Sequence, residues 1–354
     1  MFEPACCPYR SCSQHTNPTL GFAIRHGTYS PNCRPRAVQR FKCKTCQRTF
    51  SRQTFRADYR DQKPHLNAPL FSLIASGVGI RQSARTLGLT LRCTELKLRK
   101  IGRHLRRLNL NLQGPLRGDA KLHFDEFETY EGQRNTRPLS VPVLIESETR
   151  FIIWAESASI RPRGKMTNKR LKAIEAAEKQ HGIRKDLSRR SVRRTLARGA
   201  ALAASSRSVL LNTDEKISYR RVAKKLFGER RLSHEKTNSK LARWTWNPLF
   251  AINSEEAIMR DLMGRLRRES WLVSKKRRYL DLALHLHAAY RNLVRKRFNR
   301  DEESPAQLLG FLPRRLTPTE VLSWRQDWFE RSVHPLSRTG RTIGSWLAGT
   351  ARAA

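Results

Sequence analysis

The chain has 354 residues, enough for a large core or for two or three modules. Lys and Arg total 71 against 30 Asp and Glu, and the resulting formal net charge of +41 opposes compaction unless a polyanion offsets it. Nucleic acid is the polyanion we expect, and the 7 Trp, 7 Tyr and 14 Phe exclude a merely disordered basic tail.

The sequence predicts no membrane span, because it contains no run of about 18 apolar residues. Its first residues lack the basic start and the apolar stretch of a signal peptide. We therefore expect a cytoplasmic protein with no membrane partner.

Six of the seven cysteines fall between Cys6 and Cys46, which in an intracellular protein indicates metal binding rather than disulfides. Two close pairs, Cys7 with Cys12 and Cys43 with Cys46, suit a tetrahedral zinc site of four thiolates. Four thiolates leave no open coordination position, so this zinc is expected to be structural.

Two other cysteines compete for this site. Cys6 directly precedes Cys7, and the spacing from Cys7 to Cys12 is wider than in the second pair. Cys33 is a fifth candidate. Unconnected free thiols are the alternative interpretation. We predict a zinc ribbon over residues 1–60.

The next stretch, residues 61–115, has the pattern of a helix-turn-helix DNA-binding region. Within residues 76–90, Ala84 is small where two helices would cross, and Gly88 falls where a turn is needed. A helical stripe then follows at Leu98, Ile101, Leu105 and Leu108. The alternative is an ordinary helical hairpin with a basic face. The candidate DNA contacts, expected on or near the exposed side, are Arg81, Gln82, Arg92, Lys97, Arg99 and Lys100.

Residues 116–298 alternate strand-like and helix-like runs, an α/β order. Strands are expected at residues 122–127, 139–146, 150–155 and 208–214, with a hairpin turn at 147–149. A basic helical insertion is expected near residues 160–204, and its arginines should contact phosphates. Further helices are expected at residues 219–227, 254–269 and 276–298.

Two acids lie on strands of this α/β stretch in an otherwise basic chain. Asp125 lies in the first strand, and Asp214 ends the strand at residues 208–214. A ribonuclease-H-like sheet places those strands side by side, so the two carboxylates would converge on Mg²⁺ or Mn²⁺. Two such ions activate a nucleophile and stabilise the leaving oxygen of a phosphodiester. The alternatives are a turn or N-cap role for Asp214 and an Arg-paired edge carboxylate for Asp125.

The order of motifs resembles insertion-sequence transposases of the DDE class, which carry an N-terminal zinc ribbon and helix-turn-helix before a ribonuclease-H-like catalytic domain. The resemblance covers the chain up to about residue 298, and the tail at residues 304–328 also reads like members of one such group. The motifs are the zinc ribbon, the helix-turn-helix, residues 125–129, 213–215 and 233–235, and the block from residue 247 to 275.

The resemblance implies a first catalytic Asp at Asp125 and a second at Asp214. It also implies strand cleavage and strand transfer of an insertion sequence, with the element's terminal repeats and target DNA as partners. Such proteins act as homo-oligomers on DNA in the prokaryotic nucleoid. The family's third acid is normally a Glu on a following helix, and here ungapped matching places Asn253 at that position.

The third acid is therefore predicted from helical geometry. At about 100° per residue, Glu255 lies near the centre of the apolar stripe, and Glu256 lies roughly 100° from it. We predict Glu255, with Asp261 as the second choice and Glu235 as a choice from a loop. An acid in the first helical turn also opposes the helix dipole without any metal. The stripe consists of Ile258, Met259, Leu262 and Leu266.

The sequence thus predicts four stretches: the ribbon at 1–60, the helix-turn-helix at 61–115, the catalytic domain at 116–298 and a tail at 299–354. The leading hypothesis is an active DNA transposase that uses two Mg²⁺ or Mn²⁺ ions and one structural Zn²⁺. The alternatives are a non-enzymatic, sequence-specific DNA-binding protein and a structure-selective nuclease of the same fold.

Overall fold

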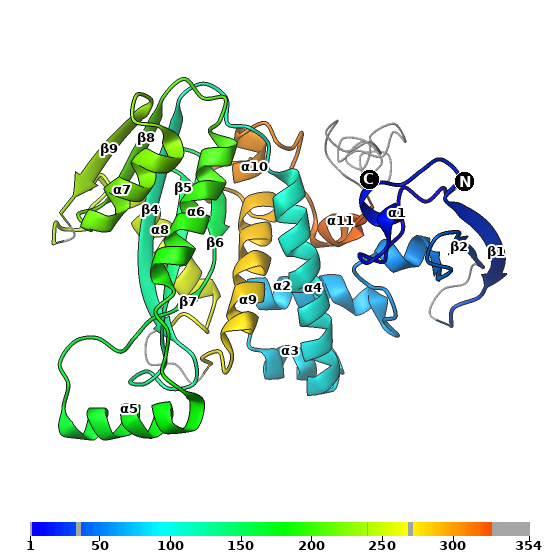
Figure 1. Cartoon of the computed structure of the whole chain (residues 1–354), viewed down its shortest axis with the longest axis horizontal. Coiled ribbons are helices and arrows are strands. Elements are labelled where there is room, and N and C mark those ends of the chain that lie inside the picture. Colours follow the sequence, from blue (N-terminus) through cyan, green and yellow to red (C-terminus); the bar gives the residue numbers. More distant parts are fainter. Residues whose placement is uncertain (1, 33–36, 239, 268–271, 328–354) are drawn as a thin grey trace. The chain divides into compact units, whose positions relative to one another are not determined.

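The computed structural model describes residues 2–32, 37–238, 240–267 and 272–327 (Figure 1). The chain divides into two compact units. The first comprises residues 1–72, 80–112 and 316–354, and the second comprises residues 73–79 and 113–315. The predicted ribbon and helical region therefore belong largely to one unit. No helix in the described ranges is both long enough and apolar enough to cross a bilayer.

The first unit opens with a small antiparallel sheet. Its strands are β1 (Ala23–Tyr29), β2 (Val38–Cys43) and β3 (Thr49–Ser51), in the order β1-β2-β3. The short helix α1 (Ser13–Thr16) precedes them, and the 3₁₀ turns η1 (Arg52–Phe55) and η2 (Pro64–Leu66) follow. Because alternate strand residues share a face, Phe41 and Cys43 point together into a core with Phe22, Phe50 and Phe55.

Three helices follow, as the sequence predicts for this stretch: α2 (Asn67–Ala75), α3 (Ile80–Thr86) and α4 (Leu91–Leu112). Ala84 is buried, and Gly88 takes a φ of +58° in the turn between α3 and α4. Such a φ favours glycine, which has no Cβ to clash with the backbone. Helix α4 buries the predicted stripe at Ile101, Leu105 and Leu108.

The end of the described chain belongs to the first unit. Helix α11 (Pro318–Ser323) leads to Trp324, which is 1% exposed and lies 5.2 Å from His104 of α4, measured between ring centroids. The backbone amide of Gln326 donates to the carbonyl of Phe55 at 2.9 Å. The predicted tail at 299–354 is therefore divided, because burial of Trp324 joins residues from 316 onward to the first unit. Residues 328–354 lie outside the described residues.

The second unit is built on a mixed sheet with the order β6-β5-β4-β8-β9. Strands β4, β5 and β6 pair antiparallel, whereas β8 pairs parallel to β4 and β9 pairs parallel to β8. All four predicted strands are present, and the hairpin turn at residues 147–149 is confirmed. Strand β9 was not predicted, because its side chains are mostly exposed and polar. The strands are β4 (Ala120–Tyr130), β5 (Pro138–Glu146), β6 (Ile152–Ala155), β7 (Ala158–Ser159), β8 (Val209–Asp214) and β9 (Leu232–Thr237).

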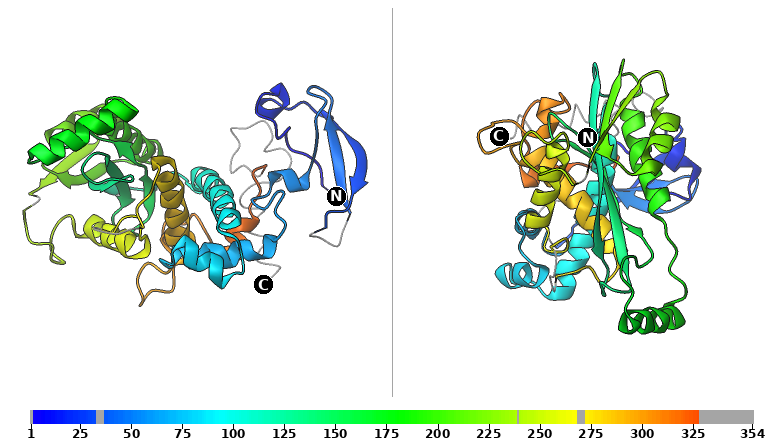
Figure 2. Two further views of the ribbon diagram at one scale, coloured as in Figure 1. Left: turned by 90° about the horizontal axis from the view of Figure 1, so that it is seen from below. Right: turned by 90° about the vertical axis from the view of Figure 1, so that its left-hand side faces the viewer.

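Helices cover both faces of this sheet (Figure 2). Helices α6 (Ser188–Leu202) and α7 (Ile217–Phe227) lie on one face, and α8 (Phe250–Leu262) and α9 (Arg277–Ala289) lie on the other. The second face holds a core in which Phe127 and alternate residues of β5 meet apolar residues of α8 and α9. Gly199 brings α6 close to the sheet, since a Cβ there would lie 2.5 Å from Leu144 Cδ2. The short helix α10 (Pro305–Leu308) completes the unit.

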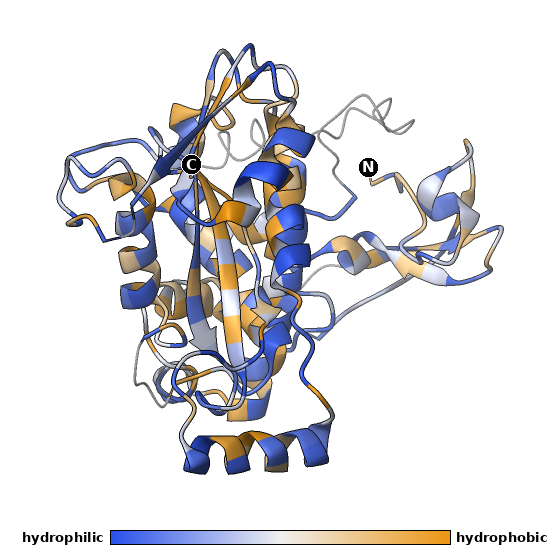
Figure 3. Ribbon diagram, turned by 60° about the vertical axis from the view of Figure 1, so that its left-hand side comes forward, coloured by the Kyte–Doolittle hydropathy of each residue, from blue (hydrophilic) through white to orange (hydrophobic). Residues whose placement is uncertain are grey.

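The basic insertion forms two helices rather than one continuous helical region. Helix α5 (Asn168–His181) ends at Gly182, whose φ is +77°, and α6 begins at Ser188. Helix α5 has no buried residue and carries both hydrophilic and hydrophobic residues on its surface (Figure 3). Helix α6, in contrast, packs on the sheet through Val192 and Leu196.

The predicted helices 254–269 and 276–298 are shorter and shifted. Helix α8 runs from Phe250 to Leu262, four residues earlier at its start, and residues 268–271 lie outside the described residues. Helix α9 continues as the π-helical turn η3 (Tyr290–Val294). This turn buries two adjacent polar side chains, Arg291 and Asn292.

Asn292 takes the place of a strand partner for β6. Its amide group donates to the carbonyl of Ile152 and accepts from the amide of Ile152, both at 2.9 Å. Both backbone groups are buried, so each would otherwise lack a partner.

We expect Asn292→Ala to lower the free energy of unfolding of the second unit by about 2–4 kcal/mol, because it leaves two buried backbone groups unpaired. Amide hydrogen exchange at Ile152 should accelerate in parallel. The exposed Asn168→Ala on α5 is the control, and it should change neither quantity. Unchanged exchange at Ile152 in Asn292→Ala would contradict this role.

Candidate functional site

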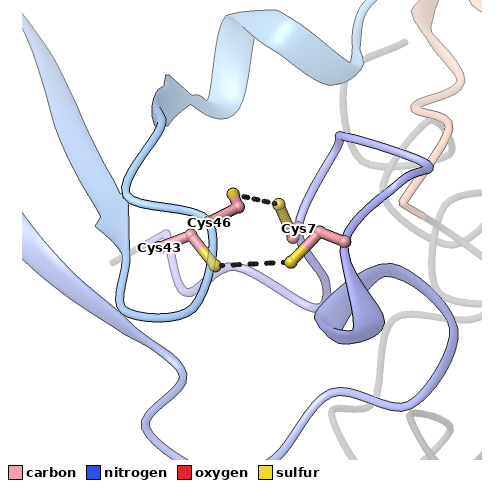
Figure 4. A group of neighbouring side chains, drawn as sticks. Cys7, Cys43 and Cys46 are labelled. Atoms are coloured by element: carbon pink, nitrogen blue, oxygen red, sulfur yellow. Dashed lines mark hydrogen bonds between the residues drawn. The ribbon is translucent and has the colours of Figure 1, made fainter.

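The four predicted cysteines come together in the first unit. Cys7 and Cys12 flank the loop before α1, Cys43 ends β2, and Cys46 lies in the turn before β3. The Sγ atoms of Cys7 and Cys46 are 3.7 Å apart, those of Cys12 and Cys43 are 3.8 Å apart, and all four lie within 4.8 Å of one another (Figure 4). Four sulfurs at about 2.3 Å from a tetrahedral zinc ion stand about 3.8 Å apart, so this cluster suits a structural metal such as zinc.

The backbone around the cluster favours thiolates. At Cys43, burial raises the pKa of the thiol, but backbone amides of Cys46 and Thr45 donate to it and the net effect lowers the pKa. At Cys7, burial raises the pKa, so this sulfur keeps its proton unless a cation replaces it. Metal binding at such a cluster therefore releases protons.

The structure separates the competing cysteines. Cys6 is not part of the cluster, and burial, with a contribution from Asp327, raises its pKa to about 12. Cys7 rather than Cys6 joins the group of four cysteines, a choice that the sequence left open. Cys33 lies outside the described residues.

The predicted acids Asp125 and Asp214 lie on neighbouring parallel strands of the second unit. The register ends with His123 of β4 paired to Asn212 of β8, and Asp125 and Asp214 each lie two residues beyond this pair. Burial raises the pKa of Asp125 to about 6, and the charge of Asp214 adds to the rise. One oxygen of each carboxylate accepts a nearby backbone amide, from Glu126 at 2.7 Å and from Lys216 at 3.1 Å.

The third carboxylate beside Asp125 belongs to Glu256 of α8. Glu256 is 3% exposed, and its Oε1 atom has no hydrogen-bond partner. Burial raises its pKa to about 8, and the charge of Asp125 adds to this rise, whereas Arg260 and Arg243 oppose it. Arg260 lies 3.5 Å from the other oxygen, Oε2. A buried carboxylate with an open oxygen beside Asp125 offers ligand atoms of the kind that divalent cations prefer.

Glu255, the predicted third acid, forms a buried ion pair instead. Its two oxygens accept from Nε and Nη2 of Arg291 at 2.9 and 2.5 Å, and both side chains are fully buried. Arg291 also donates to the carbonyls of Lys296 and Arg297. The helical-face argument correctly placed Glu255 toward the interior, but it did not anticipate a buried arginine there. A charge in this position needs its partner, because an unpaired buried ion costs several kcal/mol.

The two alternative acids also lie apart from Asp125. The side chain of Asp261 is 78% exposed and lies 3.8 Å from Arg267. Glu235 is exposed on β9, opposite Asn212. The apolar stripe from residue 258 onward favoured Glu255 over Glu256 in the sequence. With the helix starting at Phe250, the buried residues are Ala251, Ile252, Glu255, Glu256 and Met259.

Glu126, next to Asp125, has a structural role. It accepts hydrogen bonds from Ser140 of β5 at 2.7 Å and from Tyr219 of α7, and it pairs with Lys216. These contacts join β4 to β5 and α7. They leave Asp125 as the acid of β4 that faces α8.

The three carboxylates are spaced more widely than the cysteines. Within the described ranges, only the cysteines have all their ligand atoms within 4.8 Å. The three carboxylates therefore do not form a cluster as tight as the cysteine site.

The predicted DNA contacts on the helical region fall into two groups. Arg81, Gln82 and Arg92 are exposed, and Arg99 is half-buried. Lys97 is not on the exposed side, which corrects the prediction, and Lys100 is half-buried.

Lys97 is 3% exposed and donates to Asn67 Oδ1 and to the carbonyl of Lys63, both at 2.8 Å. Both lysines pair with the buried Asp61. They hold α4 against the segment that precedes α2, because a buried lysine requires such partners.

A strongly basic surface covers the outer side of α6 and α7. These helices pack against each other and present no exposed acid. Arg189 to Arg198 of α6 belong to the stretch predicted to contact phosphates. The exposed cations are Arg189, Arg190, Arg193, Arg194, Arg198, Arg220, Arg221 and Lys225.

Comparison with known proteins adds no family assignment. No family model matches the chain, and no curated protein matches it.

We expect purified protein to contain about one zinc ion per chain, because four thiolates fill one tetrahedral shell. Cys43→Ser should lose the metal and lower the thermal stability of residues 1–60. Cys93→Ser, which changes a cysteine outside the cluster, is the control and should retain the metal. Retention of stoichiometric zinc by Cys43→Ser would contradict the assignment.

Without added divalent cations, the stability of the wild-type chain should fall more steeply between about pH 5 and pH 8 than that of Glu256→Gln. The folded state raises the pKa of Glu256 from 4.5 to about 8, so folding favours the protonated carboxyl. This stabilisation is complete below the unfolded pKa and is lost as pH rises through the folded pKa. Urea denaturation at several pH values measures the difference. Asp261→Asn is the exposed control, and parallel profiles for wild type and Glu256→Gln would refute the expectation.

Proposed function

We propose that the chain is a DDE-type DNA transposase that cleaves and joins DNA strands with divalent cations. The observation that carries this proposal is the convergence of Asp125, Asp214 and Glu256. Two of these acids lie just beyond the paired part of neighbouring parallel strands, and the third, which has an open oxygen, lies beside Asp125 on a helix.

The topology of the second unit supports the proposal. Three antiparallel strands are followed by helices α5 and α6 and then by β8 and β9, which run parallel to the first strand, β4. A ribonuclease-H-like sheet has its first and fourth strands side by side, with an acid on each. Strands β4 and β8 meet that requirement, with Asp125 and Asp214 as the acids.

The residues of the site have distinct parts in this proposal. Asp125, Asp214 and Glu256 would hold two Mg²⁺ or Mn²⁺ ions, which supply charge to lower the pKa of an attacking water and to stabilise the leaving oxygen. Burial of Asp125 and Glu256 excludes water and strengthens their attraction for cations. The 3′-hydroxyl released by hydrolysis would then attack a second phosphodiester.

The basic surfaces support DNA as the substrate. The eight exposed cations on α6 and α7 provide sequence-independent phosphate contacts, which fall steeply in strength with salt. Arg81, Gln82 and Arg92 on the exposed side of α3 and α4 suit recognition of the element's terminal repeats. The zinc ribbon extends this recognition region. Cleavage at two ends requires two active sites, which accords with a homo-oligomer on DNA.

A non-enzymatic DNA-binding protein is the second candidate. The contact of Arg260 with Glu256 favours it, because a cation of the protein then already faces one carboxylate oxygen. Both candidates bind DNA, and only the first cleaves it.

We expect Mg²⁺- or Mn²⁺-dependent strand cleavage that Asp125→Asn, Asp214→Asn and Glu256→Gln each reduce by at least about 100-fold, because each removes a metal-ligand charge. DNA affinity should remain within about twofold. Asp261→Asn on the same helix is the matched control and should cleave normally. Glu255→Gln should lose stability through the unpaired Arg291.

Cleavage that survives loss of Asp125 or Asp214 excludes the DDE mechanism. A wild-type chain that binds terminal repeats and never cleaves them favours the DNA-binding protein instead.

A further inference from the structure

Two tryptophans stand exposed in the loop between β9 and α8. The rings of Trp244 and Trp246 are stacked, with centroids 5.4 Å apart and planes inclined by 1°. Trp244 is 59% exposed and Trp246 is 76% exposed. Leaving large aromatic surfaces in water forgoes the burial free energy that tryptophan normally gains, so an exposed pair suggests a binding partner.

The loop holds these rings in a defined position. The buried side chain of Asn247 donates to the carbonyl of Ala242 and accepts from the amide of Leu249, both at 2.8 Å. The amide of Asn247 donates to the carbonyl of Trp244 at 3.0 Å. Asn247 therefore fixes the loop on both sides of the tryptophan pair.

The tryptophan pair lies near the carboxylate site in the chain, and a cation next to the pair acts on that site. Arg243 directly precedes Trp244, and its positive charge opposes the rise in the pKa of Glu256 that burial and Asp125 produce. Helix α8 begins at Phe250 and carries Glu256. A DNA strand held at the carboxylates would thus meet a cation and an aromatic surface together.

We propose that the outer face of the Trp244–Trp246 stack binds one unpaired nucleobase of DNA beside the carboxylate site. The position of that base relative to a cleaved bond rests on the proposed function, whereas the stacking itself does not. A base cannot enter between the rings, because stacking on both would hold them about 7 Å apart. The base must be unpaired, since a paired base hides its faces in the duplex stack.

The charge and the aromatic rings of this surface favour a nucleic acid as the bound molecule. Arg243 is exposed beside the rings and suits the phosphate that accompanies each base. The net charge of +41 favours a polyanion over an apolar protein partner. Stacking of a base on an aromatic ring contributes about 1–3 kcal/mol, and it tolerates any sequence.

The test compares three fluorescent probes on the full chain without added divalent cations. The probes are an oligothymidylate of about 12 nucleotides, an abasic oligomer of the same length and a duplex of the same length. We expect Trp246→Leu to weaken oligothymidylate binding roughly 5- to 150-fold and to leave binding of the other two probes within about twofold.

Two variants control for other effects. Trp246→Tyr keeps an aromatic face and should retain most of the affinity for oligothymidylate. Leu241→Ala removes an apolar side chain that is 53% exposed in the same loop, and it should change nothing. Intrinsic tryptophan fluorescence of the wild type should be quenched by oligothymidylate and not by the abasic oligomer.

Equal weakening for the abasic oligomer would overturn the proposal, because the tryptophans would then act on the backbone or on the fold. A change in sedimentation of Trp246→Leu with unchanged oligothymidylate affinity would also overturn it and identify a protein contact. If wild type never cleaves DNA but its oligothymidylate affinity depends on Trp246, the stacking surface stands and the transposase proposal falls. If Asp125→Asn abolishes cleavage and Trp246→Leu leaves all affinities unchanged, the transposase proposal stands and the stacking surface falls.

Discussion

The parallel pairing of β4 with β8 is the constraint on which the candidate site depends. It brings residues 89 positions apart into register, so Asp125 and Asp214 meet although α5, α6 and three strands separate them in the chain. Two carboxylates so placed repel each other, and burial raises the cost of keeping both charged. The divalent cations that we propose for this site would offset that repulsion. The cover of α6 and α7 on one face and α8 on the other fixes the strands in this register.

Adjacent residues of α8 show how one helix serves stability and chemistry together. Glu255 forms a buried ion pair with Arg291, and Glu256 faces Asp125 with one oxygen open. About 100° of helical rotation separates the two side chains, so both can be buried and still meet different neighbours. The first carboxylate is neutralised within the protein. The second is buried beside Asp125, and burial raises its pKa.

The basic residues divide in the same way. Lys97 and Lys100 form ion pairs with the buried Asp61 and hold α4 in place, whereas the arginines of α6 and α7 remain on the surface. An exposed cation retains its attraction for phosphate, and a buried one does not. The net charge alone thus overstates the number of cations that are exposed on the surface. The stacked tryptophans before α8 add an aromatic surface to a site otherwise defined by charge.

The sequence by itself determined the local features of this protein. Cysteine spacing predicted the cysteine cluster, and hydrophobic periodicity predicted the helices of residues 66–112 and four strands of the mixed sheet. Acids on strands of an otherwise basic chain indicated Asp125 and Asp214 as candidate site residues. These signals are carried by residues close in the chain or by composition. The tertiary structure decided the matters that depend on distant partners. Only packing showed that Arg291 lies beneath Glu255, that Asp61 holds Lys97, that Cys7 rather than Cys6 joins the cluster, and that Trp324 belongs to the first unit. A side chain's role follows from what it faces, and residues such as Glu255 and Arg291, 36 positions apart, face each other only once the chain has folded.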